Sequence, residues 1–125
     1  MTDQEKTLYE RLGGYDAIAA VTDKLLPRLE NDAQLGRFWA NRGDDGIARE
    51  KQLLIDYLCA SAGGPVLYTG RDMPTSHKGM GISASDWQIF IEHVRATLAG
   101  FQVPQQEQDD VLAFIDSTRD GIVET

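Results

Sequence analysis

The chain is poor in the residues that build disulfides, nucleic-acid sites and membrane spans. Its one cysteine, Cys59, cannot pair within the chain, and its place in a helical pattern favours a small buried thiol over a catalytic nucleophile. With 12 basic residues against 20 acidic ones, the net charge of -8 repels phosphate backbones and anionic membranes. No apolar run is long enough to span a bilayer, and the first residues lack the apolar stretch of a secretory signal. We therefore expect a cytoplasmic protein with no nucleic-acid and no membrane partner.

Histidine is also scarce, since His77 and His93 are the only two in the chain. His77 lies in a glycine-punctuated segment, 73–82, whereas His93 lies beside the apolar face of an expected helix. Imidazole is the side chain best suited to holding haem iron from one side, so such a cofactor would have two candidate ligands. We interpret His93 as a structural histidine. An isolated loop histidine is usually just exposed to solvent, so the residues around His77 have to decide its role.

The chain does have apolar residues that recur at three and four positions, the period of an α-helix, with little of the alternation typical of strands. A length of 125 residues, 42% of them hydrophobic, predicts a single domain, 1–125, with its own core. The expected helices lie around 8–12, from 15 to 29, briefly over 33–40, and over 47–62, 83–101 and 104–122.

Glycine, proline and capping residues define the ends of these helices. Gly63-Gly64-Pro65 should stop a helix because glycine adopts a left-handed turn at little cost. Pro27 lies inside an apolar pattern, where its missing backbone donor predicts a kink. The segment 41–46 is a polar loop in this interpretation. Two pairs match the spacing of a capping box at the start of the penultimate helix: Ser83 with Asp86, and Ser85 with Gln88.

Three ordered blocks of the sequence point to a known family. They are Thr7 to Gly14, then Gly63-Gly64-Pro65 followed by Tyr68 to Met73, and finally His77 to Ile82. Together they resemble the group I truncated haemoglobins, and their spacing agrees across nearly the whole chain. The resemblance implies an all-α truncated globin, a two-over-two helical sandwich around haem b (iron protoporphyrin), with His77 as the proximal metal ligand.

The residues around His77 suit that role. A proximal histidine presents one neutral ring nitrogen to iron while an acceptor holds the other, and Ser76 or a nearby carbonyl could provide that contact. Gly79 and Gly81 allow the backbone to pass close to a flat macrocycle. Beside His77, the residues that we expect to bind the haem are Trp39, Leu54, Leu58, Met73, Ile82 and Trp87, with Tyr68 and Arg71 at the polar rim.

The distal side, where a gas would bind, departs from the family pattern. The resemblance implies a tyrosine late in the second helix and a glutamine before the second glycine pair, but Leu26 and the pair 53–54, both leucines, stand there. A slip of one or two residues would bring in a polar side chain from 50–52, and Tyr57 lies one turn further on. A leucine-lined pocket offers oxygen no hydrogen bond. We therefore expect a preference shifted toward carbon monoxide and nitric oxide, with lower oxygen affinity or faster autoxidation.

Three classes of function remain open at this point. The first is a haem protein that binds diatomic gases (O2, NO, CO) for sensing, scavenging or oxygen transport. The second is a nitric oxide dioxygenase, which needs a stable oxygen complex and an external reductase, and the missing tyrosine argues against high efficiency. The third is a haem-free globin-like interaction module. We expect the chain to act as a monomer.

Overall fold

The computed structural model describes residues 6–40 and 43–124. Within these ranges the chain forms helices and loops and no strand, which confirms the all-α prediction. None of the described helices has the length and apolar character needed to cross a membrane. The helices are α1 (Leu8–Leu12), α2 (Tyr15–Glu30), the 3-10 helix η2 (Leu35–Trp39), α3 (Asp44–Ser61), α4 (Met73–His77), α5 (Ala84–Gly100), α6 (Gln105–Asp116) and α7 (Arg119–Ile122).

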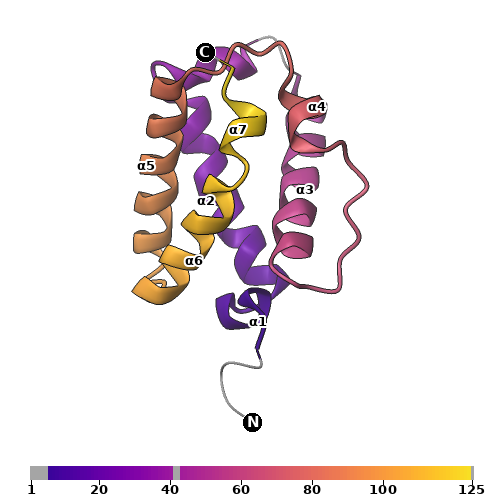
Figure 1. Cartoon of the computed structure of the whole chain (residues 1–125), viewed down its shortest axis with the longest axis vertical. Helices are drawn as coiled ribbons and strands as arrows, with labels where there is room; N and C mark the ends of the chain where they lie inside the picture. The colour runs from indigo at the N-terminus through magenta and orange to yellow at the C-terminus, as the bar shows by residue number, and fades with distance from the viewer. Residues whose placement is uncertain (1–5, 41–42, 125) are drawn as a thin grey trace.

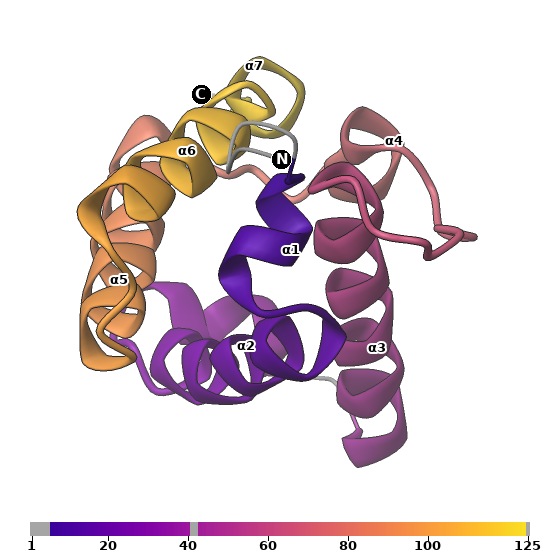
Figure 2. The same ribbon diagram turned by 90° about the horizontal axis from the view of Figure 1, so that it is seen from below.

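The four long helices form two packed pairs, α2 with α3 and α5 with α6, and α2 also packs against α5. Figures 1 and 2 show α3 and α4 on the opposite side of the molecule from α5 and α6, with α2 joining the two sides. The loop from 62 to 72, which joins α3 to α4, projects away from the body of the molecule beside α3 (Figure 1). This arrangement is the expected two-over-two sandwich, and it leaves α4 facing α7.

Local capping fixes where two of these helices begin. At α1, the Thr7 hydroxyl accepts from the Glu10 N–H while the Glu10 carboxylate accepts from the Thr7 N–H. At α5, Ser83 and Asp86 form the same reciprocal pair, with distances of 3.1 and 2.9 Å. The first of the two capping boxes suggested by the sequence is therefore the one that forms.

Three sequence expectations differ from the structure. α3 begins at Asp44, three residues before the predicted start, because the negative charges of Asp44 and Asp45 in its first turn interact favourably with the helix dipole. Positions 41 and 42 of the expected loop lie outside the described residues. α2 includes Pro27, as expected, and continues to Glu30, one residue beyond the predicted end. The predicted helix 104–122 is broken into α6 and α7, because the hydroxyls of Ser117 and Thr118 donate back to carbonyls three residues earlier.

The apolar residues form two clusters. The larger one joins α2, η2, α5, α6 and α7, and the smaller one joins α2 to α3 around Ile18, Ile55 and Cys59. Cys59 is fully buried, and burial raises the pKa of its thiol, which confirms its interpretation as a core residue.

Candidate functional site

His77 is the last residue of the short helix α4, which the sequence analysis missed. The Asp72 side chain caps this helix by accepting from the Thr75 N–H at 2.8 Å, and Pro74 lies in its first turn. An acidic cap followed closely by proline is a signal for a helix start, but five residues carry too little hydrophobic periodicity to reveal one. His77 therefore lies on a capped helix and not in the loop that the sequence predicted.

The His77 ring is oriented by two polar atoms on its own helix. Its Nδ1 lies 2.9 Å from the Met73 carbonyl oxygen and 2.9 Å from the Ser76 hydroxyl. A carbonyl can only accept, so Nδ1 carries the proton and Nε2 is left with its lone pair. The ring is half-buried. This is the tautomer and support that a histidine needs to bind iron through Nε2.

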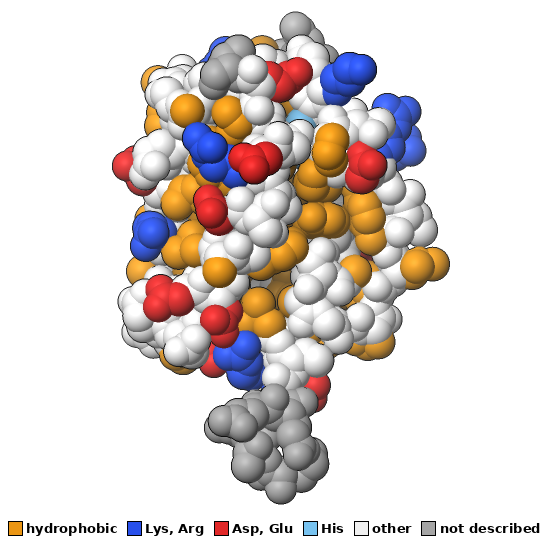
Figure 3. Space-filling model, viewed as in Figure 1, with side chains coloured by type: hydrophobic (Ala, Val, Ile, Leu, Met, Phe, Trp, Pro, Cys, Tyr) orange, Lys and Arg blue, Asp and Glu red, His pale blue; other side chains and the backbone are white. Residues whose placement is uncertain are grey.

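Five of the predicted haem contacts belong to one apolar cluster. Trp39, Leu54, Met73, Ile82 and Trp87 all belong to the larger apolar cluster, in which Ile82 and Trp87 are buried and the other three are half-buried. In Figure 3, apolar side chains fill the face between α6 and α7 on one side and α3 and α4 on the other. An apolar surface next to a half-buried imidazole fits a flat, mostly apolar cofactor such as haem.

The three other predicted contacts do not belong to the larger cluster. Leu58 packs against the smaller cluster, which includes Ile18 and Cys59. Tyr68 donates from its hydroxyl to the Arg71 carbonyl at 2.6 Å, within the outward loop, and the Arg71 side chain is exposed. Tyr68 and Arg71 lie in the loop where we expected the polar rim, and contact of these three residues with haem stays a prediction.

The distal positions are apolar in the structure as well. Leu26 is 7% exposed and belongs to the larger cluster, against which Leu54 also packs. Gln52 points away from that cluster, because it is exposed and donates to the Tyr15 hydroxyl and to Asp56. The Tyr57 ring packs on Tyr68 and Phe114, at 5.1 and 5.8 Å between ring centroids.

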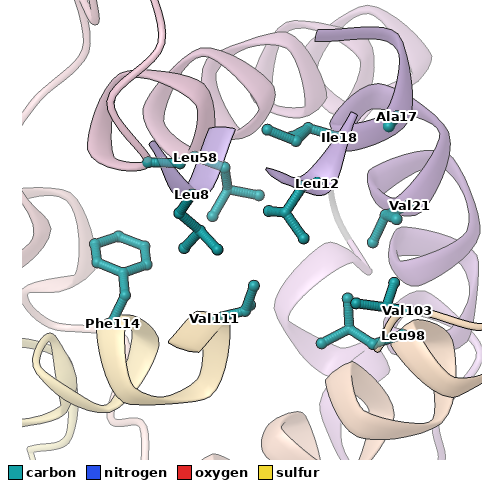
Figure 4. A pocket seen from close by; sticks show the side chains of 11 residues that line it. Leu8, Leu12, Ala17, Ile18, Val21, Leu58, Leu98, Val103, Val111 and Phe114 are labelled. Carbon is teal, nitrogen blue, oxygen red and sulfur yellow. The ribbon is translucent and has the colours of Figure 1, made fainter. Parts of the chain in front are cut away.

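Two hollows lie near these helices, and His77 lines neither. The first is an apolar cavity of about 70 Å³ between α1, α2, α3 and the α5–α6 hairpin. Figure 4 shows Leu12, Ile18, Leu58 and Phe114 among the side chains that point into it. It can hold a few water-sized or diatomic molecules but no macrocycle. The second, of about 280 Å³, lies between α2 and α3, with Leu26 among its lining residues.

The second histidine has a structural partner. His93 Nε2 lies 2.8 Å from Asp32 Oδ2, and Asp32 also accepts from the Gln34 and Leu35 backbone N–H groups. The hydrogen bond from His93, followed by those two backbone bonds, lowers the pKa of Asp32 to about 2. This arrangement confirms His93 as a structural residue and leaves His77 as the ligand candidate.

Comparisons with known proteins agree with this geometry. The profile of the bacterial-like globin family matches residues 7–124. A Group 1 truncated hemoglobin from Synechocystis is 31% identical over 111 residues, which cover 86% of this chain and 87% of the relative. One from Tetrahymena pyriformis is 28% identical over 117 residues, or 94% of each chain.

The solved structures that resemble this chain are also truncated hemoglobins. The crystal structure of the truncated hemoglobin from Tetrahymena pyriformis in its Fe(III) form aligns with a TM-score of 0.88 at 27% identity, over 96% of this chain and 100% of that one. The 2/2 hemoglobin from Synechococcus, in the cyanomet state with covalently attached heme, aligns with a TM-score of 0.85 at 25% identity, over 94% and 98%.

Proposed function

Because the chain belongs to the bacterial-like globin family, and is similar over nearly its whole length to Group 1 truncated hemoglobins, we propose that His77 binds the iron of its haem. The protein is a haem protein that binds diatomic gases. Haem iron, when bound, supplies the coordination position that takes up the gas. The remaining steps depend on what the residues of this chain do.

The hydrogen bond from His77 Nδ1 to the Met73 carbonyl carries this proposal. It fixes the ring plane and leaves Nε2 as the only nitrogen that can bind iron. Trp39, Met73 and Ile82 provide apolar surface that excludes water from a bound macrocycle. Arg71 and Lys78 are exposed cations on either side of α4 and can pair with the haem propionates.

We assign a b-type haem, held without a covalent bond. Cysteine is the residue that attaches haem in c-type sites, and the one cysteine, Cys59, is fully buried in the smaller cluster. His93 is engaged by Asp32 on another part of the fold. Coordination by His77 and apolar packing therefore have to retain the haem on their own.

The leucines at 26 and 54 set the expected gas preference. Neither can donate a hydrogen bond, and Gln52 donates to Tyr15 and Asp56 instead. Oxygen gains more from a donor than carbon monoxide or nitric oxide does, so oxygen should leave this pocket quickly. Quick release favours oxygen transport over tight storage. It disfavours nitric oxide dioxygenation, which needs a long-lived oxygen complex.

The cellular setting follows from the same chemistry. We place the protein in the cytoplasm, as a monomer, because its acidic surface and single buried thiol suit a reducing, soluble environment. Faster autoxidation would require a reductase to return the iron to the ferrous state.

Titration with hemin tests the assignment of His77. The wild-type protein should take up one haem per chain and develop a Soret band, and His77→Ala should lose it. His77→Gly should regain the band when imidazole is added, because free imidazole can replace the missing ring. The control is His93→Gln, which keeps a donor for Asp32 and should bind haem as the wild type does. An unchanged Soret band in His77→Ala would overturn the proposal.

A further inference from the structure

Glu124, near the C-terminal end of the chain, is bound to the loop that follows His77. One carboxylate oxygen accepts from the Gly79 backbone N–H at 3.0 Å, and the other accepts from the Gly81 N–H at 2.8 Å. The Glu124 N–H donates to the Ile82 carbonyl at 2.8 Å. Three hydrogen bonds therefore join one residue to the loop 79–82, which begins two positions after the histidine.

The conformation of the loop explains why it accepts a carboxylate. Gly79 and Gly81 have φ values of 83° and 68°, in the left-handed region that favours glycine. This backbone turns successive N–H groups toward one side, where they form a concave site for an anion. The same hydrogen bonds, with a contribution from the Lys78 charge, lower the pKa of Glu124. The clamp is thus made of charge-assisted bonds.

The segment that precedes Glu124 holds α4 on the other side of His77. Ile122 of α7 is buried in the larger cluster, and α7 is the helix against which α4 packs most extensively. Gly121 lies so close to Pro74 that a Cβ at 121 would approach the Pro74 Cγ to 2.9 Å. Residues 119–124 therefore touch the backbone both before and after the histidine.

A five-residue helix cannot hold its own direction, because short helices are unstable without tertiary contacts. The direction of the His77 ring must then depend on what grips α4 and its following loop. We propose that Glu124 is a positioning residue for the proximal histidine: its carboxylate clamps the loop 79–82 and so keeps His77 aimed at the iron. This inference rests on the proposed function, since it concerns the bond between His77 and haem.

The test compares Glu124→Ala and Glu124→Gln with a matched control on the same segment, Asp120→Asn, whose side chain is fully exposed. Haem loss is measured by transfer to excess apomyoglobin, and the iron–histidine stretching band is measured by resonance Raman spectroscopy of the ferrous protein. Glu124→Ala should lose haem about tenfold faster, the factor that corresponds to about 1.4 kcal/mol, and its band should shift. The haem-loss rate of Glu124→Gln should lie between those of the wild type and Glu124→Ala, because the single amide oxygen can replace only one of the two carboxylate oxygens that accept from Gly79 and Gly81. The control should match the wild type.

A second readout does not need haem. In the apoprotein, amide hydrogen exchange at Gly79 and Gly81 should be faster in Glu124→Ala than in the wild type or in Asp120→Asn. If the wild type binds no haem, the proposed function fails, while the exchange data still report on the clamp. If Glu124→Ala loses haem at the wild-type rate with an unshifted band, the inference is wrong. Should Glu124→Ala fail to fold, the same two comparisons on Glu124→Gln decide the matter.

Discussion

The Arg37 guanidinium forms a 2.7 Å salt bridge with the Asp86 carboxylate, whose side chain is 1% exposed. Asp86 also accepts from Gln34 at 2.6 Å and from the Ser83 N–H at 2.9 Å, so three donors share one buried carboxylate. The Arg37 guanidinium in turn lies 4.2 Å from the centre of the Phe38 ring. This network ties η2, which carries two aromatic residues of the apolar cluster, to the start of α5.

Replacing Asp86 with asparagine should therefore destabilise the fold. The amide keeps the shape of the carboxylate but has one acceptor oxygen to meet several donors, so hydrogen bonds to a charged group are lost. We expect a loss of about 2 kcal/mol in the free energy of unfolding, measured with urea. The control, Asp120→Asn, removes an exposed carboxylate and should change little. Equal stability of the two variants would contradict a structural role for the network.

Acid should weaken the structure through the same region. The pKa of Asp32 is lowered to about 2 from its ordinary value of 3.8. The hydrogen bond from Arg37 lowers the pKa of Asp86 well below the same ordinary value. A carboxyl group with a lowered pKa stabilises the folded state above its ordinary pKa, and this stabilisation is lost as pH falls through the lowered value.

One variant, Asp32→Asn, tests whether Asp32 contributes to the loss of stability in acid. Unfolding free energies measured from pH 7 down to the acid limit of the folded state should fall below about pH 4 in the wild type. The decline should be shallower in Asp32→Asn, which lacks one of the two carboxylates. Parallel curves for the two proteins would show that Asp32 does not contribute.

The sequence predicts the helices well where caps and periodicity agree, and less well where hydroxyls or single turns decide. Ser83 with Asp86 marks the start of α5 in both sequence and structure. The break between α6 and α7 is hidden, because apolar spacing continues through Ser117 and Thr118, and only the folded backbone shows their hydroxyls bonding back to it.

The same limit applies to the site. The residue type and surroundings of His77 are visible in the sequence, but the Met73 carbonyl that fixes its tautomer depends on the short helix α4. Gln52 remained a distal candidate on sequence distance alone, and its contact with Tyr15 joins residues 37 positions apart. The glutamate at 124 gave no local signal, since its partners lie more than 40 positions earlier.

Removing haem should lower stability more than any of these substitutions. Trp39, Leu54 and Met73 are only half-buried by the protein itself, so a bound macrocycle would cover apolar surface that the apoprotein leaves open. A ligand present at about a thousand times its dissociation constant adds about 4 kcal/mol of stability. Thermal unfolding followed by circular dichroism should show a higher Tm with haem, and His77→Ala should show the same Tm with and without it. A haem-independent Tm in the wild type would contradict the proposed site.

Leu26 offers the sharpest test of gas preference, because two substitutions separate shape from hydrogen bonding. Leu26→Tyr places a ring and a hydroxyl at the position, whereas Leu26→Phe places the ring alone. If oxygen release is fast because no donor faces the gas, the tyrosine variant should release oxygen about tenfold more slowly than the phenylalanine variant, the effect of one good hydrogen bond. Carbon monoxide release should be similar in both, since it gains little from a donor. Flash photolysis and oxygen-displacement rates provide the comparison. Equal oxygen-release rates in the two variants would contradict this explanation of gas preference. Either another residue would then already donate to the gas, or Leu26 would not face it. The hydrogen-exchange and haem-loss measurements on Glu124 do not depend on this result.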